Sequence, residues 1–146
     1  MSIAVASDHA GFELKAKIVD HLSKKNIAFT DLGTFSEERV DYPDFGVMTA
    51  KEVAAGRFRF GIIICGTGIG ISISANKVRG ARAALCCNEY MAEMARKHNN
   101  ANMLALGGRT TTIDLAVRII DVFLHTDFEG GRHAQRVEKI HSLTGR

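Results

Sequence analysis

The sequence has little proline, few cysteines and no long apolar run. A single proline among 146 residues, together with a mean hydropathy of +0.00, argues against a disordered chain. No segment approaches the roughly 18 consecutive apolar residues that a membrane-spanning helix requires. The first residues, MSIAVASDHAG, also lack the basic and long apolar regions of a signal peptide. We therefore expect a folded protein of the cytoplasm that associates with no membrane.

The cysteines are few and poorly spaced for cross-linking. Cys65, Cys86 and Cys87 are odd in number, and two of them are adjacent. They form no C-x-x-C pair, which argues against a cysteine-rich zinc site as well as a disulfide framework. This cysteine usage fits a reducing compartment.

Neither sign of charge dominates the sequence. It holds 19 lysines and arginines against 16 acidic residues, for a net charge of +3 and a pI near 8.9. This mild excess suits a small anionic ligand and does not indicate nucleic acid. In EGGRHAQR, Arg132 and Arg136 lie four residues apart and share one helix face. Two guanidinium groups on one face make a phosphate clamp, although a solvated helix face has the same pattern.

Strand-like and helix-like segments alternate along the whole chain. The run Ile62 to Ile64 is unbroken and apolar, as in a parallel strand that is buried on both faces. We expect an α/β fold: a three-layer α/β/α sandwich in one domain, residues 1–146, with a Rossmann-like five-stranded parallel sheet and an extra C-terminal helix. The predicted strands are 2–7, 27–33, 60–65, 81–87 and 101–108, and the predicted helices are 11–25, 41–56, 68–78, 88–98, 111–124 and 129–143.

The stretch CGTGIGIS at 65–72 follows the third predicted strand. Gly66, Gly68 and Gly70 allow positive φ angles and close approach of a ligand, and the helix N-terminus behind them favours an anion. The spacing departs from the dinucleotide fingerprint G-x-G-x-x-G, because the third glycine comes one residue early. Glu89 lies about where a ribose-binding acid would be, but no Walker lysine is present. The loop predicts an anion site, with dinucleotide binding and a structural turn as alternatives.

Cys65 ends an apolar strand and precedes this loop. A cysteine at the end of a strand is often a small core residue. Here the thiol can reach a pocket, and the following helix N-terminus favours its thiolate form. Cys65 is therefore a candidate nucleophile or proton-abstracting base, whereas we expect Cys86 and Cys87 to be ordinary strand residues.

Two titratable residues follow the first predicted strand in SDHAG. Asp8 is either a helix N-cap or a functional carboxylate. His9 can bind phosphate as an imidazolium or take part in acid–base chemistry. Ligands of parallel sheets bind beyond the carboxyl ends of the strands, so we expect both residues near Cys65 and near Arg109, which follows the fifth strand.

The remaining histidines give a weaker signal. His98 lies near a helix end, where the helix dipole favours its protonated ring, and the following Asn99 also suits helix termination. His9, His98 and His133 are scattered along the chain, and no H-x-x-x-H or D-x-D set occurs. We expect no metal and no other cofactor.

Six motifs are present in one order: SDHAG at 7–11, DYPDF at 41–45, CGTGIGISISANK at 65–77, RKHN at 96–99, GGR at 107–109 and EGGRHAQRVEKI at 129–140. Together they resemble the ribose-5-phosphate isomerase B family, within the wider group that includes the galactose-6-phosphate isomerase subunits. The resemblance implies a metal-free aldose–ketose isomerase of the pentose phosphate pathway, which interconverts ribose 5-phosphate and ribulose 5-phosphate through an enediolate. The alternatives are an allose-6-phosphate or galactose-6-phosphate isomerase and, from another class, a non-catalytic nucleotide-binding module.

The resemblance also implies catalytic roles. Cys65 resembles the base that moves a proton between C1 and C2, and Thr67 resembles the hydroxyl that helps proton transfer at the sugar oxygens. His98, assisted by Asp8, resembles the group that opens the furanose ring. The implied substrate-binding residues are Asp8, His9, Tyr42, Gly66, Thr67, Gly68, Ile69, Gly70, Asn99, Arg109, Arg132 and Arg136.

Within that set the implied contacts differ. The amides of residues 66–70 resemble the hole for the enediolate, Tyr42 a pocket wall, and Asn99 a contact to a substrate hydroxyl. His9 and the three arginines resemble the phosphate binders. Family members are dimers, sometimes tetramers, whose sites are built from both chains. A homodimer or tetramer with a shared site would explain a C-terminal arginine helix that has no obvious partner in its own fold.

Overall fold

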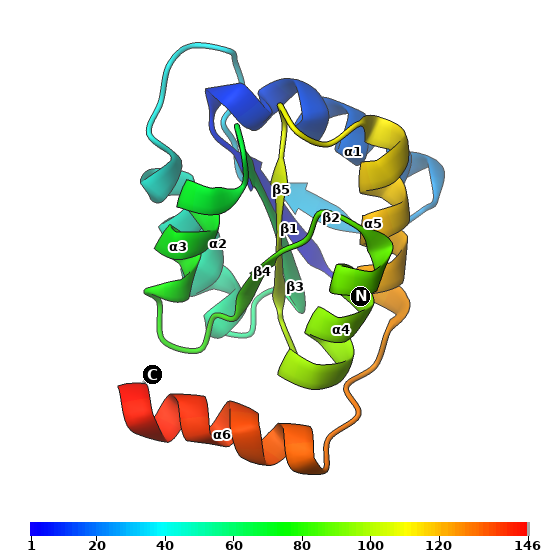
Figure 1. The fold of residues 1–146 in the computed structure, drawn as a ribbon. Helices are drawn as coiled ribbons and strands as arrows, with labels where there is room; N and C mark the ends of the chain where they lie inside the picture. Colours follow the sequence, from blue (N-terminus) through cyan, green and yellow to red (C-terminus); the bar gives the residue numbers. More distant parts are fainter. Residues whose placement is uncertain (146) are drawn as a thin grey trace.

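The computed structural model describes residues 1–145 and contains a single five-stranded sheet surrounded by helices (Figure 1). Every pairing in the sheet is parallel, and the strand order is β2-β1-β3-β5-β4. The strands are β1 (Ile3–Ser7), β2 (Phe29–Asp31), β3 (Phe60–Cys65), β4 (Ala83–Leu85) and β5 (Met103–Gly107). The helices are α1 (Phe12–Lys24), α2 (Tyr42–Ala54), α3 (Ile69–Asn76), α4 (Glu89–Asn99), α5 (Ile113–His125) and α6 (Arg132–Thr144), with a 3-10 turn η1 (His9–Gly11) before α1.

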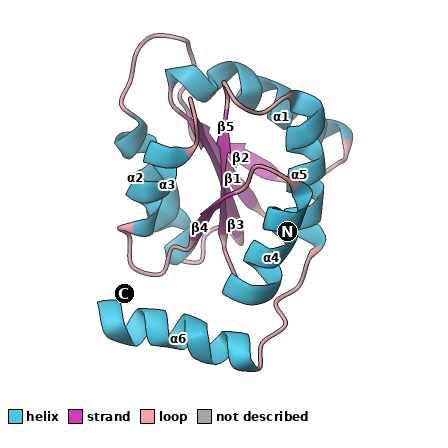
Figure 2. Ribbon diagram, in the orientation of Figure 1, coloured by secondary structure: helices cyan, strands magenta, loops and turns pink. Residues whose placement is uncertain are grey.

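Alternate residues of the central strands build two separate cores. Ile62 and Ile64 of β3 pack with residues of α1, α4 and α5, whereas Ile63 and Cys65 pack with residues of α2 and α3. This alternation follows from the pleat of a strand, whose successive side chains point to opposite faces. The predicted three-layer arrangement is therefore confirmed (Figure 2).

All the predicted elements are present, but α6 begins three residues later than predicted, and β2 and β4 are each two residues shorter at both ends. The difference at β4 changes the place of two cysteines. The strand ends at Leu85, so Cys86 and Cys87 lie outside it, although the Cys86 amide still donates to the Ala105 carbonyl at 3.3 Å. Cys86 is buried and Cys87 is exposed. The chain turns toward α4 at this point, because the side chain of Asn88 accepts a hydrogen bond from the Met91 amide and caps that helix.

The sixth helix lies apart from both layers. It packs on α4 and crosses the lower end of the molecule in Figure 1, whereas α1 begins at the upper end, after β1. The upper end therefore carries the carboxyl ends of the strands and the lower end their amino ends. No helix in the described part of the chain is long and apolar enough to span a membrane.

Candidate functional site

The β3–α3 loop places the Cys65 thiol at the start of a helix. The Cys65 sulfur accepts a hydrogen bond from the Gly68 amide, with 3.2 Å between the sulfur and the nitrogen, and the residue is only 4% exposed. Gly68 has a φ of +79°, and a Cβ atom there would lie 2.6 Å from a side-chain carbon of Leu85. Position 68, whose amide donates to the Cys65 sulfur, therefore requires a glycine, because its backbone conformation and the space around it both exclude a side chain.

The loop after β5 is hydrogen-bonded to the β3–α3 loop. The Gly108 amide donates to the Cys65 carbonyl at 2.7 Å, and the Arg109 amide donates to the Gly66 carbonyl at 2.9 Å. A Cβ atom built on Gly66 would lie 3.3 Å from a guanidinium nitrogen of Arg109. The Arg109 charge therefore lies directly beside the glycine loop, as predicted.

Two of the amides assigned to an enediolate hole already have acceptors. The Gly68 amide donates to the Cys65 sulfur, and the Ile69 amide donates to the Thr67 hydroxyl at 3.3 Å. The first N–H groups of a helix have no partners within the helix, so the amide of Gly70 in the first turn of α3 can still receive an anion. The anion hole is therefore narrower than the run of five amides that the motif suggests.

Asp8 and His9 complete this group from the end of β1. Asp8 is the N-cap of η1, and its Oδ1 accepts hydrogen bonds from the Ala10 and Gly11 amides at 2.9 and 3.0 Å. The cap interpretation is thus confirmed, and Oδ2 remains for another role. The Nδ1 atom of His9 lies 3.0 Å from the carbonyl oxygen of Val40, which orients the ring and leaves Nε2 for a ligand.

Tyr42, the first residue of α2, reaches the same loop. A Cβ atom on Gly70 would lie 2.6 Å from the Tyr42 ring, so the ring packs directly over this glycine. The residue is 40% exposed. The structure thus brings the predicted pocket wall to the glycine loop.

Lys15 is a buried residue near this group that the sequence did not lead us to expect. It is 1% exposed, forms an ion pair with Asp31, and donates to the Thr34 carbonyl at 2.7 Å. The Thr34 amide in turn donates to the Ser7 carbonyl at 2.8 Å, beside Asp8. Lys15 therefore ties the loop after β2 to the end of β1. Its spacing was the available signal, because it falls within the apolar stripe of α1, three residues before Ile18.

The other predicted residues lie at the opposite edge of the sheet. Cys65 is level with Gly107, and Gly61 is level with Met103, the first residue of β5. At about 3.3 Å per residue, four residues of strand place about 13 Å between these levels. His98 and Asn99 end α4 just before β5 begins, so they lie at the amino end of the strands.

Arg132 and Arg136 lie at this amino edge too, on α6. Within one chain, Arg109 therefore does not join these two arginines. Asp8 and His98 of one chain likewise lie at opposite edges of the sheet. Among residues 1–145, no carboxylate forms an ion pair with any of the three arginines. All three remain available to an anion.

His98 and His133 are not scattered in space, which corrects the sequence interpretation. Their rings stack with centroids 4.1 Å apart and an interplanar angle of 10°. Together with Glu129 they bring one potential metal ligand each to within 4.8 Å of one another. An imidazole binds a metal in the plane of its ring at about 2.0–2.1 Å, and two nearly parallel rings cannot both do so for one ion. The stacked arrangement is therefore not a metal site.

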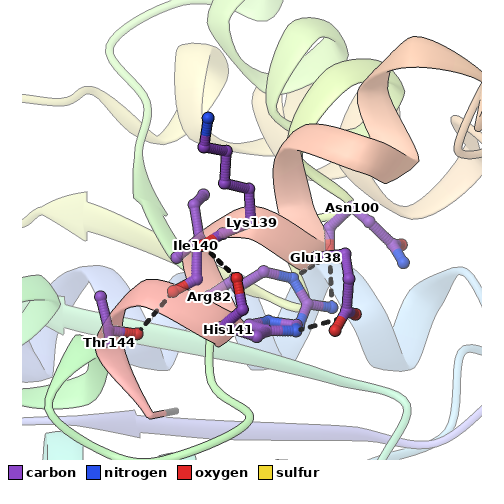
Figure 3. Close-up of polar contacts among 8 residues, drawn as sticks. Arg82, Asn100, Glu138, Lys139, Ile140, His141 and Thr144 are labelled. Atoms are coloured by element: carbon purple, nitrogen blue, oxygen red, sulfur yellow. Dashed lines mark hydrogen bonds and ion pairs between the residues drawn. The ribbon is translucent and has the colours of Figure 1, made fainter.

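Polar contacts hold α6 against the body of the protein (Figure 3). The Arg82 guanidinium donates to the Asn100 carbonyl at 2.9 and 3.0 Å and lies 3.5 Å from the Nε2 atom of His141. Burial lowers the pKa of Arg82 from its ordinary value. Beside this contact lies an open cavity of about 800 Å³ between α3, β4 and α6, which Asn99, Ile73 and Ile140 help to line.

Comparisons with known proteins agree with this arrangement. The model of the family described as "Ribose/Galactose Isomerase" matches residues 3–140. The chain is 48% identical over 144 residues to a protein of Escherichia coli strain K12 named ribose-5-phosphate isomerase B, covering 99% of this chain and 97% of that protein.

Solved structures show the same fold. Ribose-5-phosphate isomerase B of Clostridium thermocellum superposes with a TM-score of 0.97 at 53% identity, covering 99% of this chain and 98% of the other. Ribose-5-phosphate isomerase B of Mycoplasma genitalium, solved with bound ribulose 5-phosphate, superposes with a TM-score of 0.93 at 43% identity and covers 99% and 97% of the two chains. The chain therefore belongs to the ribose/galactose isomerase family.

Proposed function

We propose that this chain is an aldose–ketose isomerase that interconverts ribose 5-phosphate and ribulose 5-phosphate. The observation that carries the proposal is the Cys65 thiol, whose sulfur accepts an amide hydrogen bond at the start of α3, beside the unpaired Arg109. The relatives named above support the choice of substrate. The proposal places the enzyme in the pentose phosphate pathway as one domain of residues 1–146. The three free cysteines support a reducing compartment, the cytoplasm.

The reaction begins with the closed furanose. His98 gives a proton to the ring oxygen while the bond from C1 to that oxygen breaks, and the C1 hydroxyl gives its proton to the Asp8 carboxylate as C1 becomes the aldehyde. Asp8 assists this step. Cys65 as thiolate then takes the proton from C2 and returns it to C1, and the Thr67 hydroxyl moves the proton between the two oxygens. A base placed in this way contributes typically about 10²–10⁴ in rate.

The enediolate formed between these steps carries negative charge close to the glycine loop. Preorganised amide donors stabilise such an anion, and losing one of them costs on the order of 10²–10³ in rate at comparable sites. The amides of Gly66, Thr67 and Gly70 take this role, while the Gly68 amide holds the thiolate. His9, Arg109, Arg132 and Arg136 bind the phosphate, Asn99 a substrate hydroxyl, and Tyr42 closes the pocket.

A single chain cannot assemble this set, because the residues occupy opposite edges of its sheet. We therefore propose a homodimer, alone or within a tetramer, in which the Cys65 edge of one copy meets the His98 and Arg132 edge of the other. Apolar side chains available for such contact are Ile69 and Ile73 on α3, 52% and 56% exposed, and Ile140 and Leu143 on α6, 49% and 76% exposed. They lie on the helices that border the large cavity, which the second copy would cover.

Turnover of ribose 5-phosphate in a coupled assay tests the proposal. Replacing Cys65→Ala is expected to keep the fold and to lose nearly all activity, at least about 10²-fold. Cys87→Ala, which removes an exposed thiol, is the matched control and is expected to keep wild-type turnover. Undiminished turnover in the Cys65 variant would overturn the role of the base.

The same assay distinguishes the alternatives. Faster turnover of allose 6-phosphate or galactose 6-phosphate than of ribose 5-phosphate would replace the proposed substrate. Stabilisation by NAD or ATP in a thermal shift assay, without any isomerase activity, would instead favour a nucleotide-binding module.

A further inference from the structure

The side chain of His133 is buried without the hydrogen bonds that usually accompany a buried imidazole. It is the second residue of α6 and 6% exposed. Its Nε2 atom makes no hydrogen bond within residues 1–145, and its one ion-pair contact there, with an oxygen of Glu129, is 3.5 Å long. Buried polar atoms are normally satisfied, so this exception calls for an explanation.

His133 stacks on the flat face of His98, and this contact orients the His98 ring. The two rings are stacked at 4.1 Å with 10° between their planes. No hydrogen bond within residues 1–145 orients His98, unlike His9, whose Nδ1 atom lies against the Val40 backbone. The plane in which the His98 nitrogens point is therefore set by the face of His133.

The surroundings of His133 disfavour a positive charge on its ring. Burial lowers the pKa of His133, and the positive charges of His98, Arg132 and Arg136 lower it further, against a smaller opposing effect of Glu129. A neutral ring below His98 allows that residue to take up a proton without a second positive charge stacked on it. The face of an aromatic ring also attracts a cation.

We propose that His133 is a positioning residue for His98, which holds the His98 imidazole by face-to-face stacking in the plane needed for furanose opening. This rests on the proposed function, in which His98 protonates the ring oxygen of the substrate in the neighbouring subunit. A nitrogen acts along the plane of its own ring, so a tilt of that ring misdirects the proton. Misplacement by about 1 Å can cost 10²-fold in rate.

Two apolar variants distinguish the effect of a flat ring at position 133 from the effect of losing the imidazole. His133→Phe keeps a planar ring and is expected to retain kcat for ribose 5-phosphate within about 3-fold, whereas His133→Leu lacks the plane and is expected to lose about 10-fold or more. KM is expected to stay within about 2-fold in both, because the arginines are untouched. His125→Ala, an exposed histidine at the end of α5, is the control with unchanged kinetics.

Three kinetic results would overturn the proposal: a Phe variant as slow as the Leu variant, a Leu variant with wild-type kcat, or a loss confined to KM. The last would make His133 a phosphate-binding residue. Because a Leu variant that does not fold would also be slow, its thermal midpoint is measured first. A misfolded Leu variant is replaced by His133→Met, for which the same results are decisive.

NMR of the histidine ring protons separates this inference from the proposed function. Stacking displaces the His98 ring protons upfield in the wild type and in His133→Phe, and this displacement is expected to vanish in His133→Leu. These chemical shifts are measured without any substrate. A wild-type protein that shows the displacement but no turnover of ribose 5-phosphate refutes the proposed function, whereas an active wild type without the displacement refutes the stacking role.

Discussion

At the scale of single residues, the three thiols of this chain differ in their surroundings. Cys65 is buried, and its sulfur accepts a hydrogen bond from the Gly68 amide just before α3. Cys86 is buried, and this burial, together with the charge of Cys87, raises its pKa to about 12. Cys87 is exposed. Of the three, Cys65 is the thiol beside the glycine loop, where the proposed proton transfer takes place.

Alkylation checks this difference between the adjacent thiols. At pH 8 a thiol with a pKa of about 12 is ionised in only about one molecule in 10⁴, so Cys86 is expected to resist iodoacetamide while Cys87 reacts. Mass spectrometry of peptides after a time course measures both. Alkylation of Cys87 alone is expected to leave isomerase activity intact. Equal labelling rates of the two residues would contradict the burial argument.

The lowered pKa of His133 predicts a pH dependence of stability. An unfolded histidine titrates near 6.5, and the folded pKa lies below this value, so between the two the unfolded state binds more protons. The free energy of unfolding is therefore expected to be fully retained above about pH 6.5 and to fall as the pH drops below it. Thermal midpoints from pH 7.5 to pH 5 measure this. His133→Phe should show a shallower fall, and identical slopes would refute the assignment.

At the scale of elements, the sequence contained nearly all of the fold. The unbroken apolar run from Ile62 to Ile64 identified the central strand, and helical spacing identified the helices around it. The error at Cys86 and Cys87 arose because apolar residues that continue a strand pattern can equally pack at the start of a turn. Lys15 was missed because a lysine is normally exposed, and only the folded loop after β2 supplies its acceptors.

The ion pair of Lys15 makes the loop after β2 sensitive to one substitution. Lys15→Met leaves the Asp31 carboxylate and the Thr34 carbonyl without their cation, and we expect it to lower the free energy of unfolding by about 3 kcal/mol. Lys17→Met is the matched control, because its ion pair with Glu13 is exposed and contributes at most about 0.5 kcal/mol. Urea unfolding measures both variants. Equal losses would show that Lys15 is not a buried anchor.

At the scale of the whole molecule, the sequence predicted candidate site residues but not their division between two edges of the sheet. Cys65 ends β3, Asp8 follows β1 and Arg109 follows β5, so the three gather as a parallel sheet requires. His98 ends a helix, and Arg132 lies on a helix that belongs to neither layer. The position of His98 at a helix end already indicates the amino edge of the sheet, whereas the stacking on His133 depends on the docking of α6, which no local pattern encodes.

Mixing two inactive variants tests the division directly. Cys65→Ala removes the thiol at the carboxyl edge of its own chain, and His98→Asn removes the imidazole at the amino edge of its own chain. If each site combines opposite edges of two copies, a hybrid dimer has one site with both defects and one with neither. After random exchange of subunits, half of the dimers are hybrids, so about a quarter of the wild-type activity is expected to return.

The control is each variant taken alone through the same exchange procedure, by mild denaturation and refolding, which should restore nothing. If one chain supplied both residues of a site, every site in the mixture would carry one defect, and activity would stay at the level of the variants. The two arrangements thus differ in whether activity returns at all. A second pair, Arg109→Ala with Arg132→Ala, extends the test to phosphate binding: both arginines serve one phosphate only if the edges meet, and the mixture should then regain sites with wild-type KM.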